Sequence, residues 1–238
     1  MWNRLFIAFG VALLLAGCGT IYYRDLKPGT FSGKLFVMWV GEGDTGSGDG
    51  KFVFVPAPGL ELTFARPAGA KTAGVIRAGL MYTDGGSIPK VAQSFKGLSP
   101  WGYAPAYMIH DWIFEARHCL QDRPSDPRFQ SLKDIDFDES VKILGEAIQA
   151  LVEEGQVTRN DLAGEVVTSA VGSFVARNLW DEKGSCARTR ISDEHLAEIN
   201  AVFPTVSAST KLRTFQVSPD IPKVAPQRRA RIISVVEF

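Results

Sequence analysis

The first third of the chain and its middle differ in residue pattern, and this difference constrains the fold most. Segments 33–40 and 51–55 are rich in β-branched and aromatic residues, and the intervening stretch 41–50 consists largely of glycine and aspartate. This arrangement predicts a β-hairpin with a long loop. Further strands are predicted at 60–66, 74–82 and 232–236.

The middle of the chain shows the periodicity of amphipathic helices. Pro105 suits the first turn of a helix that runs to about His118. Asp136, followed three residues later by Glu139, predicts a capped start for a second helix, and Gly155 ends the periodic run that follows. Two successive helices are therefore expected between residues 105 and 155.

Two more helices are expected after this pair. Thr158 or Asn160 begins the first of them and Ser192 the second, which is short. The buried stripe of the first is predicted at Leu162, Val166, Ala170 and Phe174. Together these patterns predict an α+β fold, in which an N-terminal antiparallel sheet packs on a small helical bundle.

A short apolar stretch near the N-terminus ends in a cysteine. Arg4 precedes the stretch, which begins at Leu5 and closes with the run Leu15-Ala16-Gly17-Cys18. The stretch is too short to span a hydrocarbon core of roughly 30 Å, so it is interpreted as an export signal. Its layout is typical of a bacterial lipoprotein signal peptide. That layout implies cleavage before Cys18, lipidation of the thiol and attachment of the mature chain to a membrane.

This interpretation divides the chain into three parts. Residues 1–17 form the signal peptide, 18–32 hold the lipidated cysteine and a tether, and 33–238 form a single domain with an irregular C-terminal extension from about residue 204. Gly19 occupies the place where an inner-membrane retention signal has aspartate. By resemblance to enterobacterial sorting rules, the outer membrane is expected, with the protein facing the periplasm.

Export also bears on the partners of the chain. An oxidising compartment permits Cys119 and Cys186 to form a disulfide, although the sequence leaves open whether they pair. Lys and Arg total 26, as do Asp and Glu, so the formal net charge is zero. This balance argues against a nucleic-acid partner, and the expected partner is a membrane reached through the lipid anchor.

Candidate chemistry is concentrated between residues 82 and 138. The chain reads Thr83-Asp84-Gly85-Gly86-Ser87-Ile88-Pro89, then Trp101-Gly102-Tyr103, then Ile109-His110-Asp111, and a helix opens near Phe137-Asp138. Over residues 51–180 this order resembles domain-of-unknown-function family 1353, a set of uncharacterised bacterial and phage proteins. The resemblance implies no particular activity and leaves a host role and a phage role both open.

The same region is similar to bacterial secreted phospholipases A2, which carry T-D-G-C-S, then P-A-C-x-x-H-D, then an aspartate on the following helix. Thr83–Ser87 and Pro105–Asp111 match this pattern, except that Gly86 and Tyr107 replace its two cysteines. The resemblance implies hydrolysis of an ester or lipid substrate, assisted by calcium. It assigns the residues as follows: His110 as base, Asp138 or Asp136 as its orienting carboxylate, and Asp84 and Asp111 as calcium ligands.

The chemistry of these residue types agrees with that assignment. Histidine is the side chain whose unperturbed pKa lies nearest neutrality, and a carboxylate on its second ring nitrogen fixes the tautomer. A cation can stabilise the oxyanion that develops during ester hydrolysis. Because successive helical positions point about 100° apart, His110 is expected to face the substrate and Asp111 the loop that contains Asp84.

A structural interpretation remains open beside the catalytic one. His110 would then donate to a backbone carbonyl, Asp111 would cap the Gly85-Gly86 turn, and Asp136 and Asp138 would be helix N-terminal residues favoured by the dipole. Two function classes follow: a lipid-anchored hydrolase, and a non-catalytic envelope or phage-associated lipoprotein. The sequence leaves the substrate and the oligomeric state open.

Overall fold

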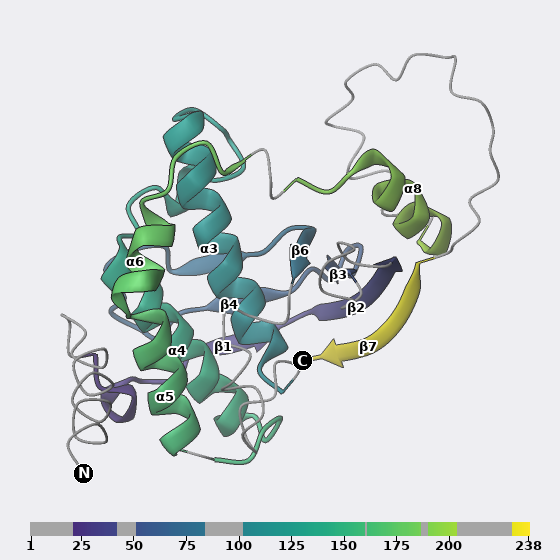
Figure 1. Ribbon diagram of the computed structural model, residues 1–238. Coiled ribbons are helices and arrows are strands. Elements are labelled where there is room, and N and C mark those ends of the chain that lie inside the picture. The colour runs from purple at the N-terminus through teal and green to yellow at the C-terminus, as the bar shows by residue number, and fades with distance from the viewer. Residues whose placement is uncertain (1–20, 42–50, 84–101, 160, 187–189, 204–229) are drawn as a thin grey trace, which may run out of the picture. The chain divides into compact units, whose positions relative to one another are not determined.

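A computed structural model of the chain describes residues 21–41, 51–83, 102–159, 161–186, 190–203 and 230–238. The described elements are η1 Tyr23–Asp25, β1 Thr30–Ser32, β2 Lys34–Gly41, β3 Lys51–Pro56, β4 Thr63–Ala65, β5 Val75–Arg77, β6 Met81–Thr83, α3 Ala104–Asp122, η2 Gln130–Leu132, α4 Phe137–Glu153, α5 Asp161–Val171, α6 Phe174–Trp180, α8 Asp193–Val202 and β7 Arg231–Glu237. Helices and antiparallel sheets are both present, which confirms the α+β class (Figure 1).

The chain divides into two compact units, each assembled from several segments of the sequence. One, called here the helical unit, comprises residues 1–31, 64–76 and 85–188. The other, called here the sheet unit, comprises residues 32–63, 77–84 and 189–238. Each unit is assembled from segments far apart in sequence, so local periodicity gave no sign of the division.

The sheet unit is built on a four-stranded sheet with the order β6-β3-β2-β7. Strands β2 and β3 pair antiparallel with Phe36 opposite Val55, which confirms the predicted hairpin, although its loop lies outside the described residues. The final strand is also confirmed, because β7 pairs antiparallel with β2 at the edge of the sheet. The sheet therefore joins the two ends of this unit's sequence.

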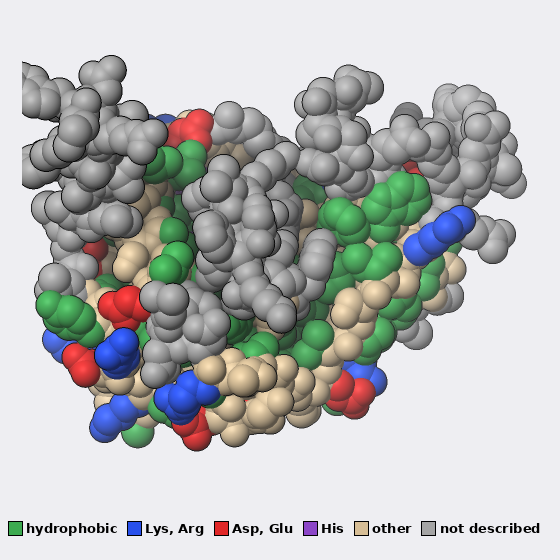
Figure 2. Space-filling model, turned by 60° about the horizontal axis from the view of Figure 1, so that its bottom comes forward, with side chains coloured by type: hydrophobic (Ala, Val, Ile, Leu, Met, Phe, Trp, Pro, Cys, Tyr) green, Lys and Arg blue, Asp and Glu red, His purple; other side chains and the backbone are tan. Residues whose placement is uncertain are grey.

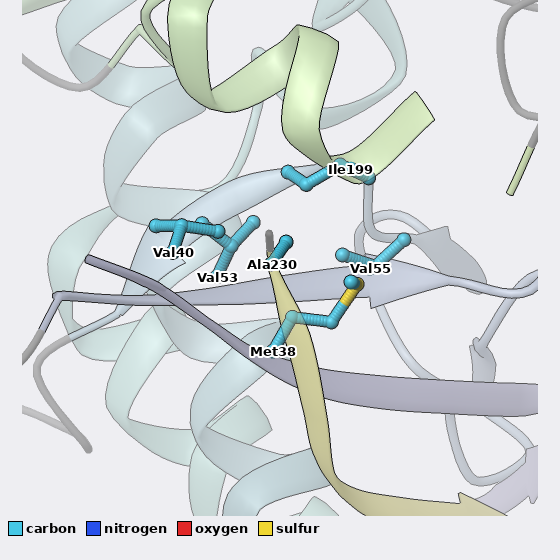
Figure 3. Close-up of a cluster of buried hydrophobic side chains, with 6 residues drawn as sticks. All are labelled: Met38, Val40, Val53, Val55, Ile199 and Ala230. Carbon is cyan, nitrogen blue, oxygen red and sulfur yellow. The ribbon is translucent and has the colours of Figure 1, made fainter. Parts of the chain in front are cut away.

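Helix α8 packs on one face of this sheet. The side chain of Ile199, on α8, is fully buried against apolar side chains of β2 and β3 (Figure 3). The cluster consists of Met38, Val40, Val53, Val55, Ile199 and Ala230. Ser192 caps α8 by accepting a hydrogen bond from the backbone N–H of His195, as its place before the helix predicts.

The helical unit contains helices α3 to α6 and most of the three-stranded sheet β1-β4-β5. Asp136 is the N-cap of α4, and its Oδ1 accepts a 2.8 Å hydrogen bond from Glu139 N. Gly155 follows the end of α4 with a φ of +72°, a conformation that favours glycine. Both boundaries of α4 therefore agree with the sequence prediction.

The stripe predicted for the helix after α4 is wrong. The helix breaks at residues 172–173, where Ser173 caps a separate helix, α6, by accepting from Ala176 N. Val166 and Phe174 of the predicted stripe are 41% and 76% exposed, whereas Val167 and Val171 are buried. Since α5 is apolar on several sides, its sequence allowed more than one stripe, and contacts elsewhere in the unit select the buried one.

The segment expected to be a tether is partly packed on the helices. Tyr23 is 1% exposed and lies against Gly164 of α5, where a Cβ atom would overlap its ring. Leu26 lies in the same way against Gly145 of α4. Gln149 Nε2 also donates to the backbone carbonyl of Tyr23 at 3.2 Å. The expectation that residues 18–32 form a tether is therefore corrected for Tyr23 and the residues after it.

Charged side chains of both signs are mixed on the surface. On the face shown in Figure 2, coloured Lys and Arg side chains lie next to Asp and Glu side chains, without a large patch of either sign. Individual ion pairs, such as Lys34 with Glu237 at 2.5 Å and Arg159 with Glu153 at 2.9 Å, account for part of this mixing. No helix among the described residues is both long enough and apolar enough to cross a membrane.

Candidate functional site

Helix α3 carries the histidine that the sequence singles out. Pro105 lies in the first turn, as predicted, and the side chain of His110 one turn later is 3% exposed. Its Nδ1 lies 3.8 Å from Oδ1 of Asp111, and its ring packs on Phe114 with centroids 4.8 Å apart. Its Nε2 has no hydrogen-bond partner in the described part of the chain.

Tyr107 lies one helical turn before His110 and is equally enclosed. The tyrosine is 2% exposed, and its hydroxyl also lacks a hydrogen-bond partner among the residues described. Burial raises the pKa of Tyr107 well above its usual value of 10, and the charges of Tyr103 and Asp111 add to this effect. The hydroxyl is therefore neutral at physiological pH. From the sequence, Tyr107 stood out only as the residue that replaces a phospholipase cysteine, although its spacing of three from His110 places both on neighbouring turns.

Buried polar atoms without partners are uncommon in native proteins. Leaving one unpaired costs about 1–3 kcal/mol. The hydroxyl of Tyr107 and Nε2 of His110 are two such unpartnered atoms, and they lie on consecutive turns of α3. The other two histidines have partners, since His118 Nε2 lies 2.7 Å from Leu179 O and His195 Nδ1 lies 2.8 Å from the Tyr82 hydroxyl. This contrast makes the middle of α3 the candidate site.

The carboxylates expected to orient His110 do not reach it. Asp136 is occupied as the N-cap of α4. Asp138 is exposed, and its Oδ1 accepts a 2.5 Å hydrogen bond from Nη2 of Arg177 on α6. The prediction that either residue orients His110 is therefore wrong. The physical reason is that both lie at an exposed helix N-terminus, where a backbone donor and an arginine compete for them.

Asp111 is the carboxylate that lies beside His110. The two side chains were expected to face different points, yet Nδ1 of His110 and Oδ1 of Asp111 are 3.8 Å apart. Asp111 was also predicted to hold calcium together with Asp84, which lies outside the described residues. Within the described ranges, no group of three or more His, Cys, Asp or Glu side chains is placed to hold a metal ion. Calcium binding therefore stays a prediction that depends on Asp84.

The two downstream cysteines form a disulfide. Cys119, near the end of α3, and Cys186 are bonded, with Cα atoms 4.6 Å apart. Asp122 supports the same connection, because its carboxylate accepts hydrogen bonds from the backbone N–H groups of Gly184 and Cys186. The pairing that the sequence left open is thus formed. Cys18, the predicted lipidation site, lies outside the described residues.

A partly open pocket of about 200 Å³ adjoins the second half of α3. It is lined by Ile113, Arg117, Leu120, Pro124, Leu132, Lys133, Ile135 and Trp180. Neither His110 nor Asp111 is among these residues, so this pocket is separate from the candidate site. Of its two basic residues, Arg117 already lies 3.7 Å from Asp181 and over the ring of Trp180.

Comparisons of the chain with protein-family models, curated proteins and solved structures found no match. The resemblances to family 1353 and to secreted phospholipases A2 therefore stay predictions that rest on short motifs.

Proposed function

We propose that this protein is a lipid-anchored lipoprotein of the bacterial cell envelope, attached through Cys18 to the outer membrane and facing the periplasm. The observation that supports this proposal, independently of the N-terminal sequence, is the disulfide between Cys119 and Cys186. Structural disulfides persist in oxidising compartments and are rare in the bacterial cytoplasm. A disulfide inside the folded part and an export signal before it therefore favour the same compartment.

Membrane fractionation in a Gram-negative host tests the anchor. The full chain is expected to sediment with outer membranes, whereas Cys18→Ser is expected to accumulate as an unprocessed or soluble form. Ser131→Ala, an exposed substitution in the folded part, serves as the control, because it leaves both the signal sequence and the disulfide intact. Sedimentation of the Cys18→Ser variant with the same yield and processing as the natural chain would contradict the proposal.

A hydrolytic role for His110 is a second candidate, and the buried, unpartnered Nε2 atom favours it. Asp111 lies 3.8 Å from Nδ1, too far for a hydrogen bond, so it acts through its charge, which favours the tautomer that carries its proton on Nδ1 and leaves the Nε2 lone pair free. In this arrangement Nε2 would accept a proton from a water that attacks an ester carbonyl. Asp111 would then stabilise the resulting imidazolium. The expected substrate class remains an ester or a lipid.

The test uses the lipidated full chain in detergent, with a short-chain aryl ester and with phospholipid vesicles, each in calcium and in chelator. His110→Gln is expected to abolish hydrolysis while the circular dichroism spectrum stays unchanged. His195→Gln, which alters a histidine of the sheet unit, is the matched control and is expected to retain activity. Absence of hydrolysis by the folded natural chain under all four conditions would favour the non-catalytic lipoprotein, in which the α3 motif is structural.

A further inference from the structure

The contacts of residues 23–31 leave little free chain between the folded unit and the predicted lipid anchor. Tyr23 and Leu26 pack against Gly164 and Gly145, and Gly29 N donates to the carbonyl of Glu146 at 3.4 Å. Further along, Phe31 N donates to Glu154 Oε1 at 3.0 Å. This segment therefore follows helices α4 and α5 from its first buried residue onward.

The length of chain between Cys18 and Tyr23 limits how far the unit can lie from the membrane. Five Cα–Cα steps separate the two residues, and a fully extended chain spans at most about 18 Å over that distance. The headgroup layer itself occupies about 5–8 Å of this reach. A helix with its side chains is about 10–12 Å across. The helices that hold Tyr23 must therefore lie within about one helix diameter of the bilayer surface.

Building on the proposed lipidation, we infer that the face formed by η1 and α5 of the helical unit rests on the phospholipid surface. Figure 1 shows η1 beside α5 in this unit. The exposed side chains next to the anchor suit an interface, since Tyr22 is 57% exposed and the exposed basic residues Arg24 and Lys27 outnumber the one exposed acidic residue of this segment, Asp25. Aromatic rings prefer the headgroup region, and basic side chains there are attracted to anionic lipids.

An apolar surface on α6 of the same unit could face the bilayer in place of the η1 and α5 face. On α6, Phe174 and Val175 are 76% and 65% exposed, and no described residue covers them. A flexible tether would allow this more apolar surface to face the bilayer instead. The docked segment is the feature that favours α5, because it fixes the attachment point on that helix.

Depth-dependent quenching distinguishes the two orientations. The lipidated full chain is inserted into vesicles that contain anionic and brominated phospholipids, and a fluorophore is attached to a single added cysteine. The positions are Ser169 on α5, Val175 on α6 and Lys133 beside η2, which packs on α3. The greatest loss of fluorescence is expected at Ser169. A greater loss at Val175 or Lys133 would overturn the inference.

Two variants test whether the docked segment sets the orientation. Gly164→Ala would displace Tyr23, and Gly74→Ala is its control, because a Cβ there meets no atom within 4 Å. A flexible linker inserted after Thr20 lengthens the tether without altering any described residue. Quenching at Ser169 is expected to fall to the level at Lys133 in the Gly164→Ala and linker variants only. Unchanged quenching in the linker variant would overturn the inference.

Vesicle co-sedimentation separates this inference from the proposed function. If the chain does not sediment with vesicles after purification from membranes, the lipid anchor itself fails. If it sediments and all three labels are quenched equally, the anchor holds and the membrane-facing surface is wrong. Every variant is expected to sediment with the vesicles. Quenching is expected to be greatest at Ser169 only in the chain with its natural tether and in the Gly74→Ala control.

Discussion

The ion pair between Arg66 and Glu146 gives the sharpest stability prediction. Nε and Nη2 of Arg66 donate to the two carboxylate oxygens of Glu146 at 2.8 and 2.9 Å, and both side chains are almost fully buried. Arg66 also lies 2.6 Å from Glu139 and donates to the backbone carbonyl of Thr72 at 3.0 Å. Burial alone would lower the pKa of Arg66, but hydrogen bonds and charges from Glu146 and Glu139 outweigh it and raise the pKa above its ordinary value.

Replacing Glu146 by Gln keeps the shape of the side chain and removes its charge. Breaking a buried pair in this way destabilises a protein by about 3–5 kcal/mol, because the remaining ion stays buried. Glu139 still compensates the charge of Arg66 in part, so the expected loss in the free energy of unfolding lies at the lower end of this range, about 3 kcal/mol. In a chain of this size each kcal/mol lowers Tm by about 2–4 °C, which predicts a decrease of about 6–12 °C.

Thermal unfolding followed by circular dichroism measures this effect. Lys142→Gln is the matched control, since Lys142 lies 3.7 Å from the same carboxylate but is 37% exposed. Such a pair contributes at most about 0.5 kcal/mol. Because the pKa of Arg66 is raised above its ordinary, already very basic value, the stabilising effect of the ion pair is fully present below that value. The difference in Tm between the natural chain and Glu146→Gln should therefore be constant between neutral pH and about pH 10. Equal Tm values for Glu146→Gln and Lys142→Gln would refute the reasoning.

Three further predictions concern stability. The disulfide between Cys119 and Cys186 closes a loop of 67 residues, so its reduction should lower the free energy of unfolding by about 4 kcal/mol in denaturant titrations with and without reductant. Burial raises the pKa values of Tyr103 and Tyr107 above the unfolded value of 10; stability should therefore fall as pH rises beyond 10, and Tyr107→Phe should reduce this loss in urea titrations. Asp136→Ala should remove the cap of α4 and cost about 1 kcal/mol by urea unfolding, without changing any hydrolytic activity.

Local signals predicted the elements that depend on neighbouring residues in sequence. The β2–β3 hairpin follows from β-branched strands on both sides of a glycine-rich loop. The cap at Asp136 and the end at Gly155 follow from side-chain and backbone preferences within a single turn. Each feature is decided within a few residues, which is why the sequence alone was sufficient for them.

Features that depend on distant contacts were predicted less well. The stripe through Val166 and Phe174 was wrong because α5 buries Val167 and places Gly164 against Tyr23, which is more than a hundred residues away in sequence. The same distance explains why the segment after residue 22 was mistaken for a free tether. The division into two units also depends on such long-range packing.

The candidate site shows the same limit of local reasoning. Choosing His110 required only its residue type and its place on a helix, and the structure gives it a buried ring nitrogen without a described partner. Choosing its carboxylate partner required knowing what else competes for each aspartate. The cap at Asp136 and the ion pair of Asp138 with Arg177 settle that competition against both residues. Asp111 lies beside the ring instead.

Mass spectrometry of the protein purified from membranes tests the lipoprotein assignment most directly. The account predicts an N-terminal peptide that begins at Cys18 and carries covalently attached acyl chains. Under non-reducing digestion it also predicts a linked peptide that contains Cys119 and Cys186. A mature chain that retains Met1, or one with an unmodified Cys18 thiol, would contradict the central claim that the lipidated cysteine attaches this protein to the cell envelope.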